Sequence, residues 1–159
     1  MKEIKAHNST IPIFIDDEDY DRVIKYVWRI QLNPNGLGVV SRQYMAGRAT
    51  IRISLASEIM RKPRQMYDHV DRNPFNNSKQ NLRPCNVQQN AFNRGKLSNK
   101  SSQYKGVTWN KQCNKWQAGI KLDGYSIHLG LFVEEKDAAL AYNLKAVELF
   151  KTFAVLNKI

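Results

Sequence analysis

The stretch MYDHVDRNPFNNSKQNLRPCNVQQNAFNR, residues 66–94, decides how the first part of this chain is organised. Its pattern predicts four consecutive elements: a short strand over 66–70, a polar loop over 71–80, a second short strand over 82–85 and a helix over 87–94. A metal-dependent attack on a phosphodiester needs a ligand for a hard cation, a base that activates water and groups that hold both in place. The stretch supplies all of these residue types: Asp68, His69, Asn81 and Asn90.

The adjacent pair Asp68 and His69 is the strongest chemical signal in the stretch. A single histidine is more often structural than catalytic, but the neighbouring acid favours a site. Consecutive side chains of a strand point to opposite faces, so the pair can serve one site only on a bent or edge strand that a helix covers. A carboxylate and an amide oxygen, such as that of Asn90 or Asn93, together suit Mg²⁺. A neutral His69 near that metal would accept the proton of the attacking water.

The positive charge of the chain is concentrated in its middle third. The 159 residues carry a net charge of +11, yet residues 72–122 contain no Asp or Glu and ten Lys or Arg residues. Basic segments attract phosphate and release its counterions, which favours a nucleic-acid partner. A helix on a membrane surface would show large apolar residues on one side, whereas this interval is rich in Asn, Gln and Ser. We therefore expect a nucleic-acid partner and no membrane.

Cysteine content and hydropathy narrow the class of protein. Cys85 and Cys113 are too few for a disulfide framework or for a cysteine-based zinc site. No apolar run approaches the length that crosses a bilayer, and the first ten residues, MKEIKAHNST, lack the apolar segment of a signal peptide. We expect an intracellular protein.

The segment before the stretch predicts several small elements. Residues 11–15, IPIFI, indicate a strand, and the acidic residues that follow indicate the start of a helix over 18–27, whose apolar residues recur at helical spacing. Residues 33–36, Asn-Pro-Asn-Gly, are typical of a turn. The pattern further predicts a hairpin and then a helical turn, over residues 38–45, 49–54 and 55–60.

The polar segment RGKLSNKSSQ, residues 94–103, predicts a linker. After it, the pattern predicts three strands and one amphipathic helix, over residues 104–109, 115–122, 125–130 and 134–150. Asp123-Gly124 is a strong hairpin signal, and small alanines along the helix would let it lie close to a sheet. The expected fold class is α+β, with a domain over 1–93, the linker, and a small three-stranded antiparallel sheet with one packed helix over 104–159.

The stretch resembles the motif of HNH endonucleases through four segments: DH at 68–69, NPFNN at 73–77, NLR at 81–83 and QN at 89–90. The upstream IPIFIDDEDYDRVIKYVW is similar to the opening of many small homing members from phages and bacteria. The resemblance implies a ββα-metal finger over about 66–94, with His69 as general base and Asn81 holding the loop and orienting the histidine. Asp68 and Asn90 would bind one Mg²⁺ or Mn²⁺ ion. Asn90 stands where many members have histidine, and Asn93 is the alternative ligand.

The C-terminal part resembles the DNA-binding domain of plant ethylene-response factors. Six segments carry this resemblance: YKGVTW at 104–109, KWQAGI at 115–120, HLGLF at 128–132, DAALAY at 137–142, LF at 149–150 and AVLN at 154–157. In that family a three-stranded sheet lies in the major groove and one helix backs it. Strand alternation then predicts which residues face the helix: Trp116, Ala118 and Ile120, with Ile127 and Leu129 beside them.

The expected DNA contacts come from both halves of the chain. Basic residues around the finger and linker are expected to grip phosphates: Arg72, Lys79, Arg83, Arg94 and Lys96. The outer face of the C-terminal sheet is expected to contribute the rest: Lys105, Thr108, Trp109, Gln117, Gly119, Lys121, Ser126 and His128. The plant family carries several arginines on this face, and their absence here predicts weaker sequence discrimination and a different target.

Together these features predict a metal-dependent DNA endonuclease of the HNH homing type, which nicks or cleaves double-stranded DNA by single-metal hydrolysis. We expect a monomer or weak dimer that needs no small-molecule cofactor and acts in the cytoplasm of a bacterial host cell, with the gene belonging either to a phage or to the host. The alternative is a sequence-specific DNA-binding regulator whose HNH finger is catalytically inactive. An RNA-binding module is a third interpretation.

Overall fold

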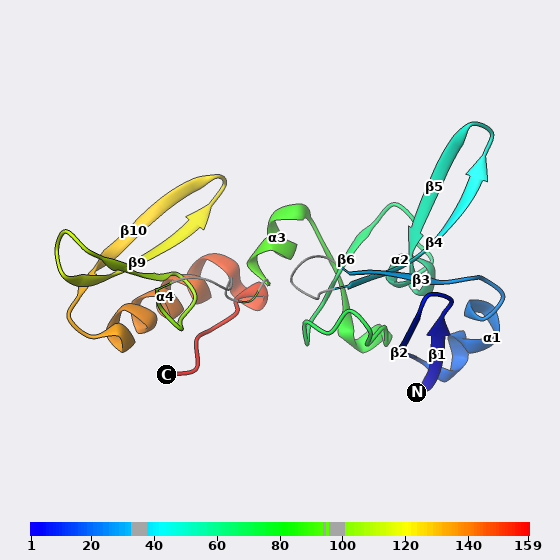
Figure 1. The fold of residues 1–159 in the computed structure, drawn as a ribbon, viewed down its shortest axis with the longest axis horizontal. Helices are drawn as coiled ribbons and strands as arrows, with labels where there is room; N and C mark the ends of the chain where they lie inside the picture. Colours follow the sequence, from blue (N-terminus) through cyan, green and yellow to red (C-terminus); the bar gives the residue numbers. More distant parts are fainter. Residues whose placement is uncertain (33–37, 94, 96–100) are drawn as a thin grey trace. The chain divides into compact units, whose positions relative to one another are not determined.

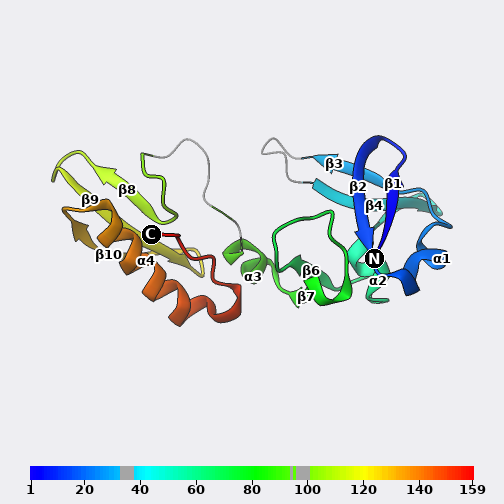
Figure 2. The same ribbon diagram turned by 90° about the horizontal axis from the view of Figure 1, so that it is seen from below.

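The computed structural model describes residues 1–32, 38–93, 95 and 101–159. They form two compact units, Met1–Val87 and Gln88–Ile159, and each unit is described by itself. The first combines three small antiparallel sheets with short helices, and the described part of the second combines one such sheet with helices (Figures 1 and 2). The expected α+β class is confirmed. None of the described helices is long and apolar enough to cross a membrane.

The first unit contains three antiparallel sheets. The first is a hairpin of β1 (Lys2–Ala6) and β2 (Ser9–Ile15), and the second is a sheet of β3 (Arg29–Leu32), β4 (Gly38–Ala46) and β5 (Ala49–Ser54). The third is a hairpin of β6 (Met66–His69) and β7 (Leu82–Cys85). Helix α2 (Leu55–Ile59) follows β5 directly, because the Ser54 hydroxyl caps it by accepting from the Ser57 N–H at 3.1 Å. Strands β2 and β4 to β7 lie where the sequence predicts them, whereas β1 and β3 have no counterpart among the predicted strands.

The predicted helix over 18–27 is wrong for most of its length. The chain forms two short elements there, a 3-10 turn η1 (Asp17–Asp19) and one turn of helix α1 (Tyr20–Val23). Trp28 is buried, and its indole N–H donates to the Val23 carbonyl oxygen at 2.9 Å. The chain therefore leaves the helix to place this indole in the core, and Ile24 and Val27, which fit the helical spacing, are exposed.

The core of the first unit is built from alternate residues of β2 together with α1 and α2. Ile13, Ile15, Val23 and Leu55 are fully buried. Phe75, in the loop between β6 and β7, packs against this cluster. The loop that carries much of the candidate site therefore rests on the core of the unit.

The second unit is a three-stranded antiparallel sheet with one long helix packed on it. β9 (Lys115–Leu122) lies between β8 (Val107–Asn110) and β10 (Tyr125–Phe132), and α4 (Glu135–Phe150) covers one face. Ala118 of β9 and the α4 alanines 138, 139 and 146 are fully buried. Small side chains at this contact let helix and sheet approach closely, as the sequence predicts. Trp116, Ile120, Ile127 and Leu129 pack on the same side, also as predicted.

Two shorter elements flank this sheet and helix. Helix α3 (Val87–Phe92) begins at the boundary between the units, and the 3-10 turn η3 (Lys151–Phe153) follows α4. The Phe92 ring stacks on the Phe150 ring with 3.7 Å between centroids. This contact joins the end of α3 to the end of α4 within the second unit.

Candidate active site and nucleic-acid interface

The β6–β7 hairpin places Asp68 opposite Arg83 and His69 opposite Leu82. The Asp68 carboxylate is buried, and Nε and Nη2 of Arg83 donate to its Oδ2 at 2.9 and 2.7 Å. A guanidinium that donates twice fixes the position of a carboxylate. Arg83, which the sequence assigns to phosphate binding, therefore lies against the candidate metal ligand.

The His69 imidazole is half-buried, and Asn77 sets its orientation. Nε2 of His69 lies 3.2 Å from Oδ1 of Asn77, whose Nδ2 donates to the Pro74 carbonyl oxygen at 3.0 Å. Because the Pro74 oxygen can only accept, the Asn77 amide must turn its own oxygen toward the ring. Nε2 therefore carries the hydrogen of the neutral ring, and Nδ1 carries the lone pair.

Burial lowers the pKa of His69 below the 6.5 of a free imidazole. The hydrogen bond with Asn77 and the carboxylates of Asp71 and Asp68 act in the opposite direction, and they do not cancel the effect of burial. The ring is consequently neutral around pH 7. The neutral ring is the form that can accept a proton from water.

Asn81 closes the loop between β6 and β7. It lies in the 3-10 turn η2 (Lys79–Asn81) and is buried. Its Oδ1 accepts from the Asp71 N–H at 2.9 Å, and its Nδ2 donates to Asp71 Oδ1 at 2.9 Å and to the Asn76 carbonyl oxygen at 2.7 Å. One amide group thus fixes both the start and the middle of the loop.

Asp71 belongs to this arrangement although the sequence interpretation does not single it out. Besides Asn81, its carboxylate accepts from the Asn73 N–H at 2.8 Å and from the Asn76 side chain at 2.7 Å. Burial alone would raise the pKa of Asp71, but these hydrogen bonds outweigh it, and the pKa is lowered. An Asp at the start of a polar loop commonly forms a turn in which its carboxylate accepts from the N–H two positions further on. The composition of the loop could therefore have indicated this role of Asp71.

Backbone hydrogen bonds tie the loop to strand β2. The Phe14 N–H donates to the Phe75 carbonyl oxygen, and the Asn77 N–H donates to the Phe14 carbonyl oxygen, both at 2.8 Å. Asn77 is only 1% exposed as a result of this packing. The residue that orients His69 is therefore itself held against the core.

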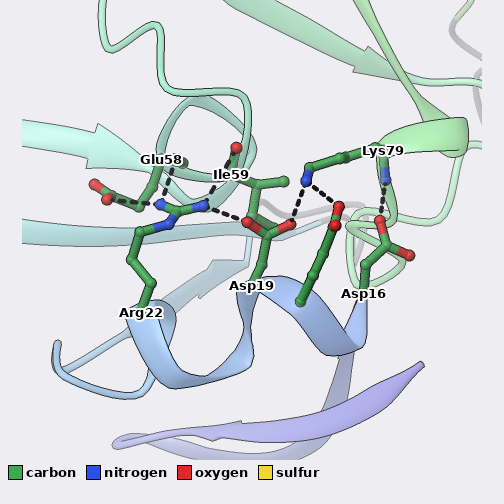
Figure 3. A network of polar contacts seen from close by, with 7 residues as sticks. Asp16, Asp19, Arg22, Glu58, Ile59 and Lys79 are labelled. Carbon is green, nitrogen blue, oxygen red and sulfur yellow. Dashed lines mark hydrogen bonds and ion pairs between the residues drawn. The ribbon is translucent and has the colours of Figure 1, made fainter.

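Acidic residues that follow β2 hold the far end of the loop (Figure 3). The Asp16 carboxylate accepts from the Lys79 N–H at 2.8 Å, and the Lys79 ammonium pairs with Glu18 and, at 3.1 Å, with Asp19. The contact with Glu18, followed by that with Asp19, raises the pKa of Lys79. Lys79, which the sequence assigns to phosphate binding, is an anchor of the loop in this structure.

The same network continues to helix α2 through Arg22 (Figure 3). Asp19 is buried at 2% exposure and pairs with the Arg22 guanidinium. Arg22 also donates to the Glu58 carboxylate at 3.1 Å and to the carbonyl oxygens of Glu58 and Ile59 at 2.8 and 3.3 Å. This network of ion pairs thus links three segments that are far apart in the sequence: the β6–β7 loop, the residues that follow β2, and α2.

The predicted site residues also include Arg72, Asn90 in α3 and Asn93 directly after α3. Arg72 is exposed and adopts a left-handed backbone conformation with φ of 63°. Asn90 is half-buried and Asn93 is buried, and both belong to the second unit. Their assignment as alternative metal ligands stays a prediction. Arg94 and Lys96 lie outside the described residues.

The oxygen donors of the candidate site suit a hard divalent cation. Across the described parts of the chain, no three His, Cys, Asp or Glu side chains gather into a metal-binding cluster. A cation at Asp68 would therefore have at most two such side chains as ligands, and amide oxygens, water or phosphate would supply the others. Mg²⁺ in proteins commonly keeps several waters in this way. The buried and oriented carboxylate of Asp68 fits that role.

Strand register in the second unit places most of the predicted DNA contacts on one face. Directly opposed residues share a face of a sheet. Three opposed pairs form the side away from α4, called here the outer sheet face: Thr108 with Gln117, Gly119 with His128 and Lys121 with Ser126. Gln117 and Gly119 are half-buried and the other four residues are exposed.

Two residues that the sequence assigns to the outer sheet face lie elsewhere. Lys105 is half-buried and its ammonium donates to the Phe92 carbonyl oxygen at 2.7 Å, so its expected exposure is wrong. Trp109 is opposed to Trp116, and the two rings meet edge to face at 5.0 Å between centroids on the helix-facing side. Since consecutive residues of a strand alternate, Trp109 does not share the face of Thr108.

Comparison with known proteins places this chain in a family. No family model matches it, and no solved structure matches it. An uncharacterized HNH endonuclease, L560, of Acanthamoeba polyphaga mimivirus is 34% identical over 149 residues, which cover 92% of this chain and 74% of the relative. Protein 3.8 of Escherichia phage T7 is 32% identical over 57 residues, which cover 36% of this chain and 47% of that protein. The chain belongs to the HNH endonuclease family.

Proposed function

We propose that this chain is a metal-dependent DNA endonuclease of the homing type, which hydrolyses phosphodiester bonds and nicks or cleaves double-stranded DNA. The observation that carries the proposal is the oriented, neutral imidazole of His69 next to the buried carboxylate of Asp68 on β6. Membership of a family with a relative named as an endonuclease supports the same activity.

In the proposed reaction, His69 accepts a proton from the water that attacks phosphorus. Asn77 holds the Nε2–H, so Nδ1 takes the proton, and the carboxylates of Asp71 and Asp68 favour the charged ring that results. The bond from phosphorus to the leaving oxygen breaks as the bond to the water oxygen forms, and the leaving oxygen takes a proton from a second water. Asn81 contributes by keeping the His69 loop closed.

Asp68 is the proposed carboxylate ligand of one Mg²⁺ or Mn²⁺ ion, and Asn90 is the proposed amide ligand. When bound, such an ion supplies a Lewis acid that stabilises charge on the leaving oxygen. Arg83 keeps the Asp68 carboxylate in one orientation, which limits the ordering needed when a cation binds.

We further propose that the second unit is a DNA-binding domain of the ethylene-response-factor type. Three antiparallel strands backed by one helix support this, as does an outer sheet face that presents Gln117, Lys121 and His128. Such a face fits the major groove. Relatives in a virus and a phage favour a phage-type gene whose product acts on DNA in the cytoplasm of its host cell.

Nicking of supercoiled plasmid DNA in Mg²⁺ or Mn²⁺ tests the proposal. We expect wild type to produce open circles, and His69→Ala to lose at least about 100-fold in rate while it binds duplex DNA as tightly as wild type. His7→Ala is the matched control, because His7 is exposed in the turn after β1, and it should keep full activity.

Two outcomes would replace this proposal. A wild type that binds DNA but cuts none with any divalent cation would be a DNA-binding regulator with an inactive finger. A preference for single-stranded RNA over duplex DNA, in competition at matched salt, would change the substrate.

A further inference from the structure

The first unit contains a second acid-free interval, separate from that of the middle third. Residues 22–57 include no Asp or Glu and six Lys or Arg residues. This interval supplies the whole sheet of β3, β4 and β5. A sheet without acidic side chains is suited to a polyanion.

The β4–β5 hairpin extends well beyond the core of its unit (Figure 1). Ile53 is buried and Arg42, its opposed residue, is half-buried, but every residue from 43 to 52 is exposed. These ten residues are called the β4–β5 arm. A two-stranded hairpin with both faces in water is marginally stable at best. The fold of the first unit therefore gives no reason for the length of this arm.

The base of the arm is firmly held. Arg42 donates to the Glu58 carboxylate at 2.9 Å, and its guanidinium lies over the Tyr26 ring at 4.0 Å from the centroid. The positive charge of Arg42 is thus engaged by contacts within the first unit. Beyond this anchor the arm has four opposed residue pairs, which at about 3.4 Å per residue reach roughly 14 Å.

The two faces of the arm offer different chemistry. Tyr44 is opposed to Ile51 on one face, and Gln43 is opposed to Arg52 on the other. When the Gln43 amide is oriented to satisfy both groups, its oxygen accepts from Nε and Nη2 of Arg52 at 2.9 and 2.7 Å, which leaves its NH₂ as a donor. Among the described residues, none pairs with the Arg48 guanidinium at the tip of the arm.

We propose that the β4–β5 arm enters the major groove of duplex DNA as a recognition surface additional to the outer sheet face. This inference rests on the proposed DNA substrate. The major groove admits a two-stranded ribbon and is roughly 8.5 Å deep, less than the reach of the arm. Arg48 and Arg52 supply positive charge for phosphates and guanine edges, Gln43 supplies an amide for adenine, and Tyr44 and Ile51 supply apolar contact for thymine methyl groups.

Charge decides between DNA and a second copy of the chain as the occupant. The arm has two arginines and no acid, so two arms would repel each other at close approach. An interface between copies would bury one apolar face and would leave Gln43, Thr50 and Arg52 in water. Duplex DNA uses both faces and the tip.

Thiol protection locates DNA on the arm without any need for cleavage. Ala46→Cys, in a Cys113→Ser background, introduces one reactive thiol on the arm, because Cys85 is buried. A mixed-sequence duplex of about 40 base pairs should slow its reaction with a maleimide roughly tenfold, whereas the same sequence as a single strand should not. Lys5→Cys, exposed on β1, is the matched control and should change less than about twofold.

A charge-removal pair gives an independent measurement. Arg48→Ala with Arg52→Ala should lower duplex affinity roughly tenfold and reduce the slope of log K against log salt by about 2. Lys5→Ala with Lys62→Ala removes the same charge from exposed positions outside the arm and should leave the slope within about 0.5 of wild type.

The outcomes separate this inference from the proposed endonuclease activity. If duplex DNA protects the Ala46→Cys thiol but the protein never cuts plasmid, DNA binding by the arm is supported and the proposed endonuclease activity is refuted. If the protein cuts DNA but its Ala46→Cys thiol reacts equally with and without duplex, DNA binding by the arm is refuted and the proposed endonuclease activity stands. Protection that rises with protein concentration in the absence of DNA also overturns the inference, because a second copy would then cover the arm.

Discussion

Asn77→Ala tests whether His69 acts through one fixed tautomer. The Asn77 side chain connects the Pro74 carbonyl oxygen to the His69 ring. The substitution leaves that oxygen without a donor and leaves Nε2 without an acceptor. The bond to Phe14 uses the Asn77 backbone and survives the change. The loop should therefore keep its path while the ring loses the contact that Asn77 supplies.

The expected size of the effect follows from these two bonds. Each neutral hydrogen bond contributes about 1 kcal/mol, and unpaired partners in a poorly hydrated site add to the loss, so the free energy of unfolding should fall by about 2–3 kcal/mol. Without the Asn77 contact the ring is less well aligned for proton transfer and can exchange tautomers, so the cleavage rate should fall about 10- to 100-fold.

Asn77→Asp separates orientation from charge. The carboxylate keeps an acceptor for the Nε2–H, but its negative charge should raise the pKa of His69. Since the base is active only when neutral, the acid limb of the rate profile should move to higher pH. The donor to the Pro74 oxygen is lost as in Asn77→Ala, but the acceptor for the ring remains, so the rate at high pH should exceed that of Asn77→Ala.

Urea unfolding and plasmid nicking across pH measure the two effects separately. Asn73→Ala is the matched control, since it removes one exposed hydrogen bond to the Phe75 N–H and should cost less than about 1 kcal/mol. The reasoning is refuted if Asn77→Ala shows the expected loss of stability yet, when folded, cuts at the wild-type rate with an unchanged pH profile.

Three further predictions concern stability. Gly106→Ala should destabilise the second unit by about 3 kcal/mol or more, because the new Cβ would lie 2.0 Å from the Tyr142 ring at a residue with φ of 77°. Gly124→Ala, at φ of 83° with nothing within 4 Å of the new Cβ, should cost only about 1–2 kcal/mol. Equal shifts of the two variants in thermal unfolding would contradict this prediction. Asp19→Asn removes a buried charge shared by Arg22 and Lys79 and should cost about 2–4 kcal/mol in urea unfolding, and a loss below about 0.5 kcal/mol would show that the network contributes little. The pKa of Asp71 is lower in the folded state than its usual value of 3.8, so the ionised carboxylate stabilises the folded state above pH 3.8. This stabilisation is lost as the pH falls through the pKa of the folded state. Asp71→Asn should therefore flatten the pH dependence of stability below about pH 4, and an unchanged profile would show that Asp71 is not its source.

Elements with a strong local signal were predictable from the sequence. The Asp123-Gly124 turn joins β9 and β10 where the dipeptide predicts it, and both strands of the β6–β7 hairpin lie at the predicted positions. The helix over 18–27 was not predictable by the same means. Its spacing was satisfied locally, but burial of Trp28 and its bond to the Val23 carbonyl oxygen required the chain to turn. Tertiary packing outweighed propensity there.

The chemistry of the candidate site was readable from residue types, whereas its partners were not. Asp68, His69 and Asn81 attract attention because of what their side chains can do. The contacts of Arg83 and Lys79 depend on which acids lie opposite them, and the acids around Asp16 come from a distant segment. Asn77 has no signal of its own, because any asparagine of a polar loop would look the same.

These internal pairings change how the net charge should be interpreted. Salt dependence of DNA binding reports the number of phosphates neutralised, with a slope of about 0.9 per phosphate on duplex DNA. Arg83, Lys79 and Arg42 already face carboxylates, so a phosphate count taken from composition is too high. Lys79→Ala should therefore lower stability and leave the salt slope unchanged, while Lys121→Ala on the outer sheet face should reduce the slope by about 1 with little effect on stability. An equal reduction of slope in both variants, measured by titration of duplex DNA at several salt concentrations, would mean that the Lys79 anchor opens to meet phosphate, and the loop around His69 would then be rearranged by DNA rather than formed before binding.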